Sequence, residues 1–385
     1  MLRIYLPALQ VAPGLTGVGV YSLELIRAMS RLPRREELVI GAPHPEYFAE
    51  LEELDGIELV PLKLPASGSM GRMLATHTVV PAEAQRLGAN LVLGPNFIAP
   101  LWGRFECAVM VHDLTFARHP ETTTRAKRVY YQLMVRRSLR RASVVFVSTQ
   151  TVGNELLEFA PETAGKIWRT PEGVSPGYQE NGDREEVAAS GLTGPERKDF
   201  LFVGTLEPRK NLARLLRAHG NLCRGLPDFP ALRIVGGRGW EDEGIVRALH
   251  EHPDPSRLIR LGYCEPVRLR AEYDSALALV FPSVYEGFGL PVLEAMARGC
   301  PVLTSRDIAT EEVAGGAALL VDPLDTGDIE RALARLAKDR SLRLRLAHAG
   351  VRRSAEFSWE ICAEETLKGL HTLLGVGEGI PQGGT

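Results

Sequence analysis

Short, unbroken runs of apolar residues recur along the chain and predict strands that are buried on both faces of parallel sheets. Stretches with apolar residues at helical spacing alternate with these runs, which is typical of doubly wound α/β domains. The runs are 2–6, 38–41, 57–61, 91–94, 107–112 and 144–148, then 200–203, 232–237, 258–262, 276–281 and 300–305. Between the two sets, residues 179–198 are mostly polar with scattered glycines, so we expect a domain boundary there.

The most informative stretch, residues 276–306, places a glycine turn and the start of a helix directly after a buried strand. The turn contains Gly287 and Gly289. Pro291 suits the first position of the following helix, and Gly299 suits its end. Open α/β sheets bind ligands at the carboxyl ends of their strands, and turn amides together with a helix dipole favour an anion. The pattern therefore predicts a binding site for an anionic ligand.

Two carboxylates flank this turn. Glu286 lies in the turn and Glu294 lies one turn into the helix, so both can reach one ligand. Two acceptors beside an anion site suit the hydroxyls of a ribose or a hexose. Taken singly, each has an ordinary alternative role, because Glu294 could merely complement the helix dipole and Glu286 could be solvated.

The string from Pro282 to Val302 as a whole resembles the C-terminal signature of the retaining glycosyltransferases of family 4. In that family a Pro-Ser pair leads into E-G-F-G-L-P-x-x-E-A-M-A-x-G-x-P-V, and every position of the pattern is present here. The resemblance implies that Glu294 holds the nucleotide ribose. It also implies that the donor sugar faces Glu286 and the amides of the loop after it, namely Gly287, Phe288, Gly289 and Leu290.

Two tracts in the first half of the chain resemble the same family. Gly17, Gly19 and Tyr21 match a G-x-G-x-Y loop whose amides approach the donor diphosphate or the acceptor. Residues 111–121 resemble V-H-D-L-x-F-x-x-x-P-E, which implies that His112 contacts the donor sugar near the reacting carbon. From the residues alone, a His-Asp pair at a strand end is as often a structural hydrogen bond, and a G-x-G is as often a packing turn.

The second half adds a diphosphate motif. Residues 204–211 match the family's G-T-x-x-P-R-K-N, beginning at Gly204, and the resemblance implies that Arg209 and Lys210 contact the donor diphosphate. It also implies that the nucleotide base lies along the turns that follow the next strands, the second of which leads into Tyr263.

The region between the halves departs from the family pattern P-N-G-V-D. Glu172 stands in place of the Asn and Ser175 in place of the Asp, so the family's contacts from these positions are not carried over. The overlapping G-V-S-P-G at 173–177 formally matches a nucleophile elbow. Pro176 has no N–H to donate to an oxyanion, so we interpret this match as a decoy.

The resemblance covers residues 2–374 and implies the GT-B fold, an α/β architecture of two Rossmann-like domains facing across a cleft. We expect an acceptor domain over residues 1–175 and a nucleotide-sugar donor domain over residues 176–356. Residues 357–374 should form a helix that crosses back to the first domain, and residues 375–385 a disordered tail.

The implied reaction transfers a hexose, with retention, from a nucleotide diphosphate sugar to a hydroxyl of a sugar or lipid-linked acceptor. The V-H-D-L tract most resembles mannosyl- and rhamnosyl-transferring members, so GDP-mannose is the first expectation and UDP-sugars are the alternative. No D-x-D occurs, so neither a catalytic metal nor a further cofactor is implied. The rivals are a non-catalytic sugar-nucleotide-binding relative and a dinucleotide-dependent oxidoreductase, whose glycine fingerprint would need glycine where Ser22 stands.

The composition is that of an ordinary soluble protein, and we expect a cytoplasmic location. The 385-residue chain has a formal net charge of -3, which gives no hint of a nucleic-acid partner. No apolar stretch approaches the roughly 20 residues of a bilayer span, and the first residues lack the pattern of a signal peptide. The cysteines form no C-x-x-C pair, which suits a reducing cytosol and argues against a zinc site.

Residues 122–154 contain no acidic side chain but several basic ones interleaved with apolar residues. The basic residues are Arg125, Lys127, Arg128, Arg136, Arg137, Arg140 and Arg141. Two interpretations are open: Arg125–Arg141 forms an interfacial helix that holds the enzyme on the inner face of an anionic membrane, or it is a solvated helix packed on the first domain.

Overall fold

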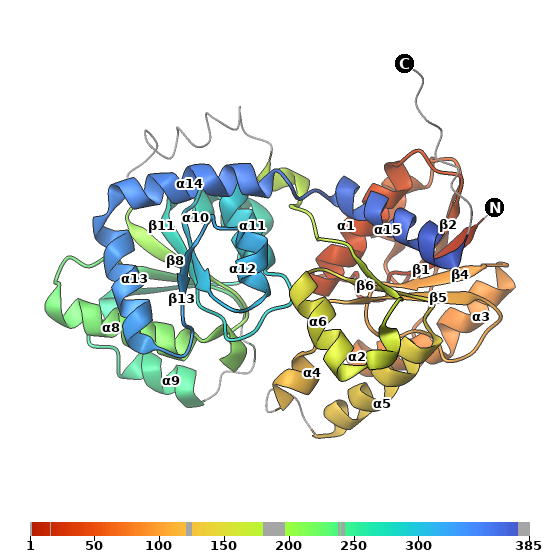
Figure 1. The fold of residues 1–385 in the computed structure, drawn as a ribbon, viewed down its shortest axis with the longest axis horizontal. Helices are drawn as coiled ribbons and strands as arrows, with labels where there is room; N and C mark the ends of the chain where they lie inside the picture. Colours follow the sequence, from red (N-terminus) through yellow and green to blue (C-terminus); the bar gives the residue numbers. More distant parts are fainter. Residues whose placement is uncertain are drawn as a thin grey trace, which may run out of the picture. The chain divides into compact units, whose positions relative to one another are not determined.

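The computed structural model describes residues 2–15, 17–120, 125–179, 197–237, 239 and 243–375. The chain forms two compact units (Figure 1). The first unit contains the chain up to Gly173 and again from Ser358, and the second contains Val174–Phe357. Glu121 of the V-H-D-L tract and residues 376–385 of the expected tail lie outside the described residues.

The first unit is built on a seven-stranded parallel sheet in the order β3-β2-β1-β4-β5-β6-β7. Its strands are β1 (Arg3–Pro7), β2 (Glu37–Ala42), β3 (Ile57–Pro61), β4 (Leu91–Gly94), β5 (Glu106–Val111), β6 (Val144–Val147) and β7 (Ile167–Arg169). The central strands β4 and β6 are buried along their whole length, as unbroken apolar runs predict. The sequence pattern missed β7, because this edge strand is short and its residues are half-buried or exposed.

The helices of the first unit follow the strands in alternation. They are α1 (Gly17–Arg31), α2 (Gly68–His77), α3 (Val79–Arg86), α4 (Thr115–Arg118), α5 (Arg125–Arg141), α6 (Gln150–Phe159) and α15 (Trp359–Leu374), with the 3-10 helices η1 (Pro45–Leu51) and η3 (Pro161–Thr163). Two begin at hydroxyl caps: Thr149 accepts from the Val152 N–H in α6, and Ser358 accepts from the Ile361 N–H in α15, each over 3.2 Å.

The C-terminal helix α15 belongs to the first unit. It packs beside α1, as Figure 1 shows. Its Trp359, Cys362 and Leu370 are buried, and Glu365 accepts a hydrogen bond from the indole N–H of Trp168 over 3.1 Å. The last described helix, α15, therefore completes the core of the first unit.

The second unit is built on a six-stranded parallel sheet in the order β10-β9-β8-β11-β12-β13. Its strands are β8 (Asp199–Val203), β9 (Leu232–Val235), β10 (Leu258–Gly262), β11 (Ala276–Phe281), β12 (Val302–Ser305) and β13 (Leu319–Val321). Its helices are α8 (Leu212–Gly225), α9 (Glu243–His250), α10 (Pro266–Ser275), α11 (Leu290–Ala297), α12 (Ala309–Ala314), α13 (Thr326–Lys338) and α14 (Arg340–Ser354), with the 3-10 helices η4 (Pro176–Tyr178), η5 (Pro208–Lys210) and η6 (Pro255–Arg257).

The strand order reverses beside the first strand of each sheet. In the first unit β1 lies between β2 and β4, and in the second β8 lies between β9 and β11. Ligands of open α/β sheets bind at such switch points, outside the carboxyl ends of the strands. The loop over residues 204–211 follows β8 and the glycine turn follows β11, so the predicted donor residues of these two loops lie at the second switch point. Among the described helices, none is both long and apolar enough to cross a membrane.

Candidate active site

The loops that follow β8 and β11 are tied together at the carboxyl edge of the second sheet. The backbone N–H of Val284 donates to the carbonyl oxygen of Arg209 over 2.8 Å. Asn211 lies in the left-handed region with φ 61°, and its side-chain amide donates to the carbonyl oxygen of Pro282 over 2.9 Å. These bonds hold Arg209 and Lys210, at the end of η5, against the glycine turn.

Glu286 is the centre of a buried ion cluster. Its Oε1 accepts from Lys210 Nζ over 2.6 Å, and its Oε2 accepts from Arg209 Nη1 over 2.8 Å. Arg209 is also paired with Glu207, at 2.7 Å. Lys210 Nζ lies 4.9 Å from the ring centroid of Phe281, so the ammonium group is held between a carboxylate and an aromatic ring.

The charges of this cluster are strongly coupled. Burial alone would raise the pKa of Glu286, but the charges of Lys210 and Arg209 and the hydrogen bond from Lys210 outweigh it and lower that pKa to about 2. Burial lowers the pKa of Lys210, against the attraction of Glu286. The cluster therefore holds an ionised carboxylate and two cationic side chains in fixed positions, where the cations can also stabilise a second anion.

The glycine turn leads into α11 through Gly289, whose φ of 102° is strained for any L residue. A Cβ at this position would also lie 2.7 Å from Cγ2 of Thr310. Phe288 is buried and its ring packs edge-on to that of Phe357, with the centroids 5.9 Å apart. These contacts constrain the backbone of the turn, and α11 begins at Leu290 with its positive dipole end beside the ion cluster.

Glu294 lies on α11, one turn from its start, and accepts a hydrogen bond from the Tyr273 hydroxyl over 2.9 Å. Burial raises the pKa of Glu294 to about 7, against the bond from Tyr273, which lowers it. The ring of Tyr178 packs edge-on to Tyr273, with the centroids 6.1 Å apart. Further hydroxyl donors would stabilise the ionised form of this carboxyl group. The hydroxyls of a ribose could be those donors.

Two other predicted donor residues of the second unit differ in their surroundings. Gly204 lies against the β9 turn, because a Cβ at Gly236 would be 1.9 Å from the Gly204 carbonyl oxygen. A Cβ at Gly204 would be 3.5 Å from Cδ of Lys210, so this glycine lies beside the ion cluster. Tyr263 follows β10 at the sheet edge, with β9 between β10 and β8, and its side chain is exposed.

In the first unit, His112 follows β5 and both of its ring nitrogens have protein partners. Nε2 donates to the carbonyl oxygen of Pro95 over 2.9 Å, and Nδ1 donates to Glu172 Oε1 over 3.1 Å. Burial alone would lower the pKa of His112, but the hydrogen bond and charge of Glu172 and the Pro95 carbonyl raise it overall. These contacts favour the protonated form of His112, and a ligand would meet its ring rather than a free nitrogen.

Glu172 is a site residue that motif reasoning missed. It was set aside because it departs from the family pattern, yet it is 5% exposed and is the counter-ion of His112. No local sequence signal marks this pairing, because both the burial of Glu172 and its approach to His112 arise only from the fold. Tyr21 completes the cluster: its ring lies edge-on to His112, with the centroids 4.5 Å apart.

The surroundings of the two glycines in the G-x-G-x-Y loop differ, and only one of the two positions is too crowded for a side chain. A Cβ at Gly19 would lie 2.8 Å from the carbonyl oxygen of Gln10, so packing of the loop against α1 requires glycine there. A Cβ at Gly17 would meet nothing within 4 Å. Gly17 is therefore not explained by packing, and its open surroundings suit close approach of a ligand to the backbone.

The predicted site residues form two groups. Arg209, Lys210, Glu286 and the turn Gly287–Leu290 are brought together in the second unit, with Gly204 beside them and Glu294 on the adjoining helix. Gly17, Gly19 and His112 belong to the first unit, at the start of α1 and the end of β5.

Two family models match the chain. The model described as Glycosyltransferase Family 4 matches residues 15–178, and the model described as Glycosyl transferases group 1 matches residues 183–353. Together they cover most of both units.

Two relatives of this chain match it over different shares of their own length. "O-antigen chain mannosyltransferase B" of Escherichia coli is 30% identical over 378 residues, which is 92% of this chain and 95% of that protein. "Serotype-specific mannosyltransferase WbdA" of Escherichia coli is 28% identical over 239 residues, or 61% of this chain, and the match spans 29% of that larger protein.

Solved structures share the fold. Sucrose-phosphate synthase from Thermosynechococcus elongatus has a TM-score of 0.76 at 20% identity and covers 98% of this chain and 100% of its own. Anabaena Alr3699/HepE, solved in complex with UDP-glucose, has a TM-score of 0.73 at 14% identity and covers 97% of this chain and 100% of its own. The predicted fold class, with two parallel α/β domains, is confirmed.

Proposed function

The chain belongs to glycosyltransferase family 4, and from this membership we propose that it transfers a hexose from a nucleotide diphosphate sugar to an acceptor hydroxyl, with retention. The observation that carries the proposal is the buried cluster of Arg209, Lys210 and Glu286 beside the glycine turn. Its cations lie beside the start of α11, where the departing diphosphate of such a donor needs stabilisation.

In this mechanism the bond between the anomeric carbon and the phosphate oxygen breaks while the acceptor oxygen approaches the same face. The leaving phosphate takes the proton of the acceptor hydroxyl, and Arg209, Lys210 and the amides at the start of α11 stabilise the charge that develops on the diphosphate. These groups do the work that a metal would otherwise do, so we propose a reaction that is independent of added metal and uses no cofactor beyond the substrate.

We assign Glu286 an orienting role. The alternative is a nucleophilic carboxylate, as in retaining glycosidases. Both oxygens of Glu286 are occupied by Lys210 and Arg209, and the two cations withdraw charge from the carboxylate. This arrangement supports a role in which Glu286 positions a sugar hydroxyl relative to the diphosphate-binding side chains. It does not favour a role in which Glu286 attacks the anomeric carbon.

For the sugar, we propose mannose carried by GDP. The support is the identity to Escherichia coli mannosyltransferases and the V-H-D-L tract. UDP-sugars are the alternative, because solved structures of the same fold bind UDP and UDP-glucose. Glu294 would accept the ribose hydroxyls in either case, and we propose a sugar or a lipid-linked sugar as acceptor.

A second proposal concerns α5 as a contact with anionic membrane. Val129 and Leu133 are exposed one turn apart on this helix, which is favourable for insertion at a headgroup boundary. Against it, Arg136 stacks over Phe159 at 4.4 Å and Arg140 pairs with Glu162 at 3.2 Å, as in a solvated helix. The side chains of Arg125 and Lys127 lie outside the described part of the chain. Co-sedimentation with anionic vesicles should fall on charge reversal of Arg137 and Arg140, and unchanged binding would contradict the contact.

The first experiment is a thermal-shift titration with GDP, UDP, ADP and their sugar conjugates in the presence of a chelator. A nucleotide at a hundredfold excess over its Kd should add about 2.7 kcal/mol to the stability of the folded state. A shift with one nucleotide family identifies the donor class, and incubation with that donor and oligosaccharide acceptors should then give product, whose anomeric configuration NMR can read.

The same measurements separate the rivals. Nucleotide binding without any turnover would favour a non-catalytic sugar-nucleotide-binding relative. A thermal shift with a nicotinamide dinucleotide, and none with sugar nucleotides, would favour the oxidoreductase and would remove the roles assigned to Arg209 and Lys210.

A further inference from the structure

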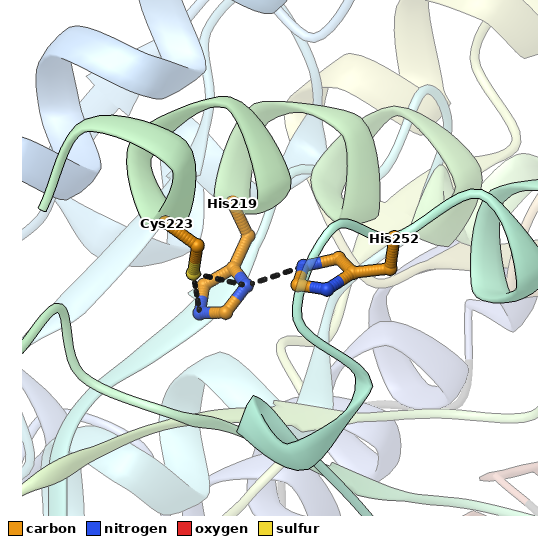
Figure 2. A group of neighbouring side chains, drawn as sticks. All are labelled: His219, Cys223 and His252. Atoms are coloured by element: carbon orange, nitrogen blue, oxygen red, sulfur yellow. Dashed lines mark hydrogen bonds between the residues drawn. The ribbon is translucent and has the colours of Figure 1, made fainter. Parts of the chain in front are cut away.

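Three side chains with metal-binding atoms lie together in the second unit, outside the ion cluster (Figure 2). His219 and Cys223 come from α8 and are one helical turn apart, and His252 comes from the loop after α9. His219 Nδ1 lies 3.0 Å from His252 Nε2 and 3.7 Å from Cys223 Sγ. All three ligand atoms lie within 4.8 Å of one another.

Two of these separations, both measured from His219 Nδ1, are close to those of a tetrahedral zinc site. With zinc-ligand bonds of about 2.0–2.1 Å to nitrogen and about 2.3 Å to sulfur, ligand atoms lie about 3.3–3.6 Å apart. The observed 3.0 and 3.7 Å lie on either side of this range. The helix fixes the spacing of His219 and Cys223, because residues four apart share one face. Cys223 Sγ lies 4.0 Å from His219 Nε2 as well as 3.7 Å from Nδ1, so the Cys223 side chain would have to turn for its sulfur to share an ion with Nδ1.

Each imidazole also has a backbone carbonyl at its second ring nitrogen, the one that is not in the His219–His252 contact. His219 Nε2 lies 2.8 Å from the carbonyl oxygen of Pro230, and His252 Nδ1 lies 2.9 Å from that of Asp254. A carbonyl accepts but cannot donate, so when both bonds form, the inner nitrogens face each other with lone pairs. This is the outer-shell arrangement that orients metal-ligating histidines.

The loop that carries His252 offers the imidazole a hydrogen-bond partner whether or not an ion is bound. The backbone N–H of Asp254 also lies 3.2 Å from His252 Nδ1, so the other tautomer can accept there and donate from Nε2 to His219. Binding of an ion would shift the ring to the tautomer that donates to the Asp254 carbonyl.

We propose that His219, Cys223 and His252 bind one zinc ion that fixes the second half of α8 to the loop between α9 and η6. The donor set is two imidazoles and a thiolate, which suits zinc and disfavours magnesium and calcium. The α8 helix begins at Leu212, two residues after Lys210, so the ion would anchor the helix that follows the cationic pair without taking part in transfer. Zinc binding displaces the thiol proton of Cys223, and water completes the fourth position.

This proposal departs from the expectation, drawn from the cysteines, that the chain has no zinc site. That expectation counted cysteine pairs, and a site with a single cysteine and two histidines has none. The pair His219 and Cys223 at helical spacing was the signal in the sequence, but its partner His252 lies on a different segment that only the fold brings near.

The test uses the full chain, stripped of metal with a chelator and titrated with Zn²⁺ and separately with Co²⁺. We expect one equivalent of zinc in competition with a chromogenic chelator, a rise in Tm of several degrees, and the absorption of tetrahedral thiolate-bound cobalt. Cys223→Ala and His252→Gln should each abolish the cobalt spectrum and lower zinc affinity at least a hundredfold.

Two variants serve as matched controls. His250→Gln replaces an exposed histidine two residues from His252, and Cys264→Ala replaces a cysteine outside the cluster. Both should retain stoichiometric zinc. The proposal is overturned if the wild-type chain binds less than a tenth of an equivalent, if Cys223→Ala leaves binding unchanged, or if only Cu⁺ binds. The thiolate absorption of the wild-type cobalt form reports on the ligands even if a variant fails to fold, and none of these readouts depends on transferase activity.

Discussion

Lys210 is buried in contact with one carboxylate and one aromatic face, and so its charge has a fixed position before any ligand binds. A preorganised charge costs no reorganisation when the leaving diphosphate develops, which makes such groups large contributors to catalysis. Glu286 holds Lys210 in place and favours its charged form, against the burial that lowers the pKa of Lys210.

Replacement of this charge gives the first prediction. Lys210→Ala should lower kcat by about two to three orders of magnitude, the size expected for loss of one preorganised electrostatic partner. Steady-state kinetics with the donor found by thermal shift would measure it. Lys368→Ala, which removes a half-exposed lysine on α15, is the control and should leave kcat unchanged. A loss below about threefold for Lys210→Ala would remove this residue from the mechanism.

The ion pair of His112 and Glu172 gives a prediction about pH. A histidine whose pKa is raised in the folded state binds its proton more tightly there than in the unfolded chain, where the ordinary value is 6.5. The pair therefore stabilises the fold below pH 6.5, and this contribution is lost as pH rises through the folded-state pKa of His112.

Glu172→Gln should remove this dependence, because glutamine can still accept the hydrogen bond but carries no charge. NMR titration should show a lower pKa for His112 in the variant, and urea unfolding should show a smaller loss of stability above pH 6.5. Glu162→Gln, which removes a surface partner of Arg140, should leave the His112 titration as it is. An unchanged pKa in Glu172→Gln would contradict the role of Glu172 as counter-ion.

Among the elements, the turn into α11 depends closely on its sequence. Gly289→Ala forces an L residue to φ 102° and places a Cβ 2.7 Å from Thr310, so it should destabilise the second unit by about 1–3 kcal/mol. Gly316→Ala is the control, since Gly316 has φ 83° but nothing within 4 Å of the added Cβ. Chemical denaturation would compare the two, and equal losses would show that the contact with Thr310 has no cost.

How far these elements follow from the sequence depends on whether their determinants are local. Strands such as β11 and the helix start after Gly289 were predictable, because apolar runs and glycine positions act over a few residues. The strand β7 was not, since its three residues carry no apolar run and pairing with β6 alone makes them a strand. The pairs His112–Glu172 and His219–His252 also escaped, because each joins segments that only the fold brings together.

For the molecule as a whole, the decisive feature is that the first unit is discontinuous. The second unit, Val174–Phe357, is inserted between the body of the first unit and its last helix α15. Loss of packing in α15 should therefore weaken the unit that begins the chain, although the helix follows the second unit in sequence. Nucleotide binding, which we assign to the second unit, provides an independent marker of that unit's integrity.

The final prediction uses this separation. Leu370 is fully buried on α15, so Leu370→Ala should lower the stability of the first unit by about 2–5 kcal/mol, the usual cost of a core cavity. Ile361→Ala on the same helix is the matched control, because Ile361 is exposed and should cost less than about 1 kcal/mol. Calorimetry with and without the nucleotide would assign the transitions, since ligand raises only the transition of the unit that binds it. If α15 stabilises the first unit alone, Leu370→Ala should lower the ligand-insensitive transition and leave the ligand-sensitive one in place. An equal fall in both transitions would mean that the two units unfold as one cooperative body, and the division of the chain at Gly173 would have no energetic meaning.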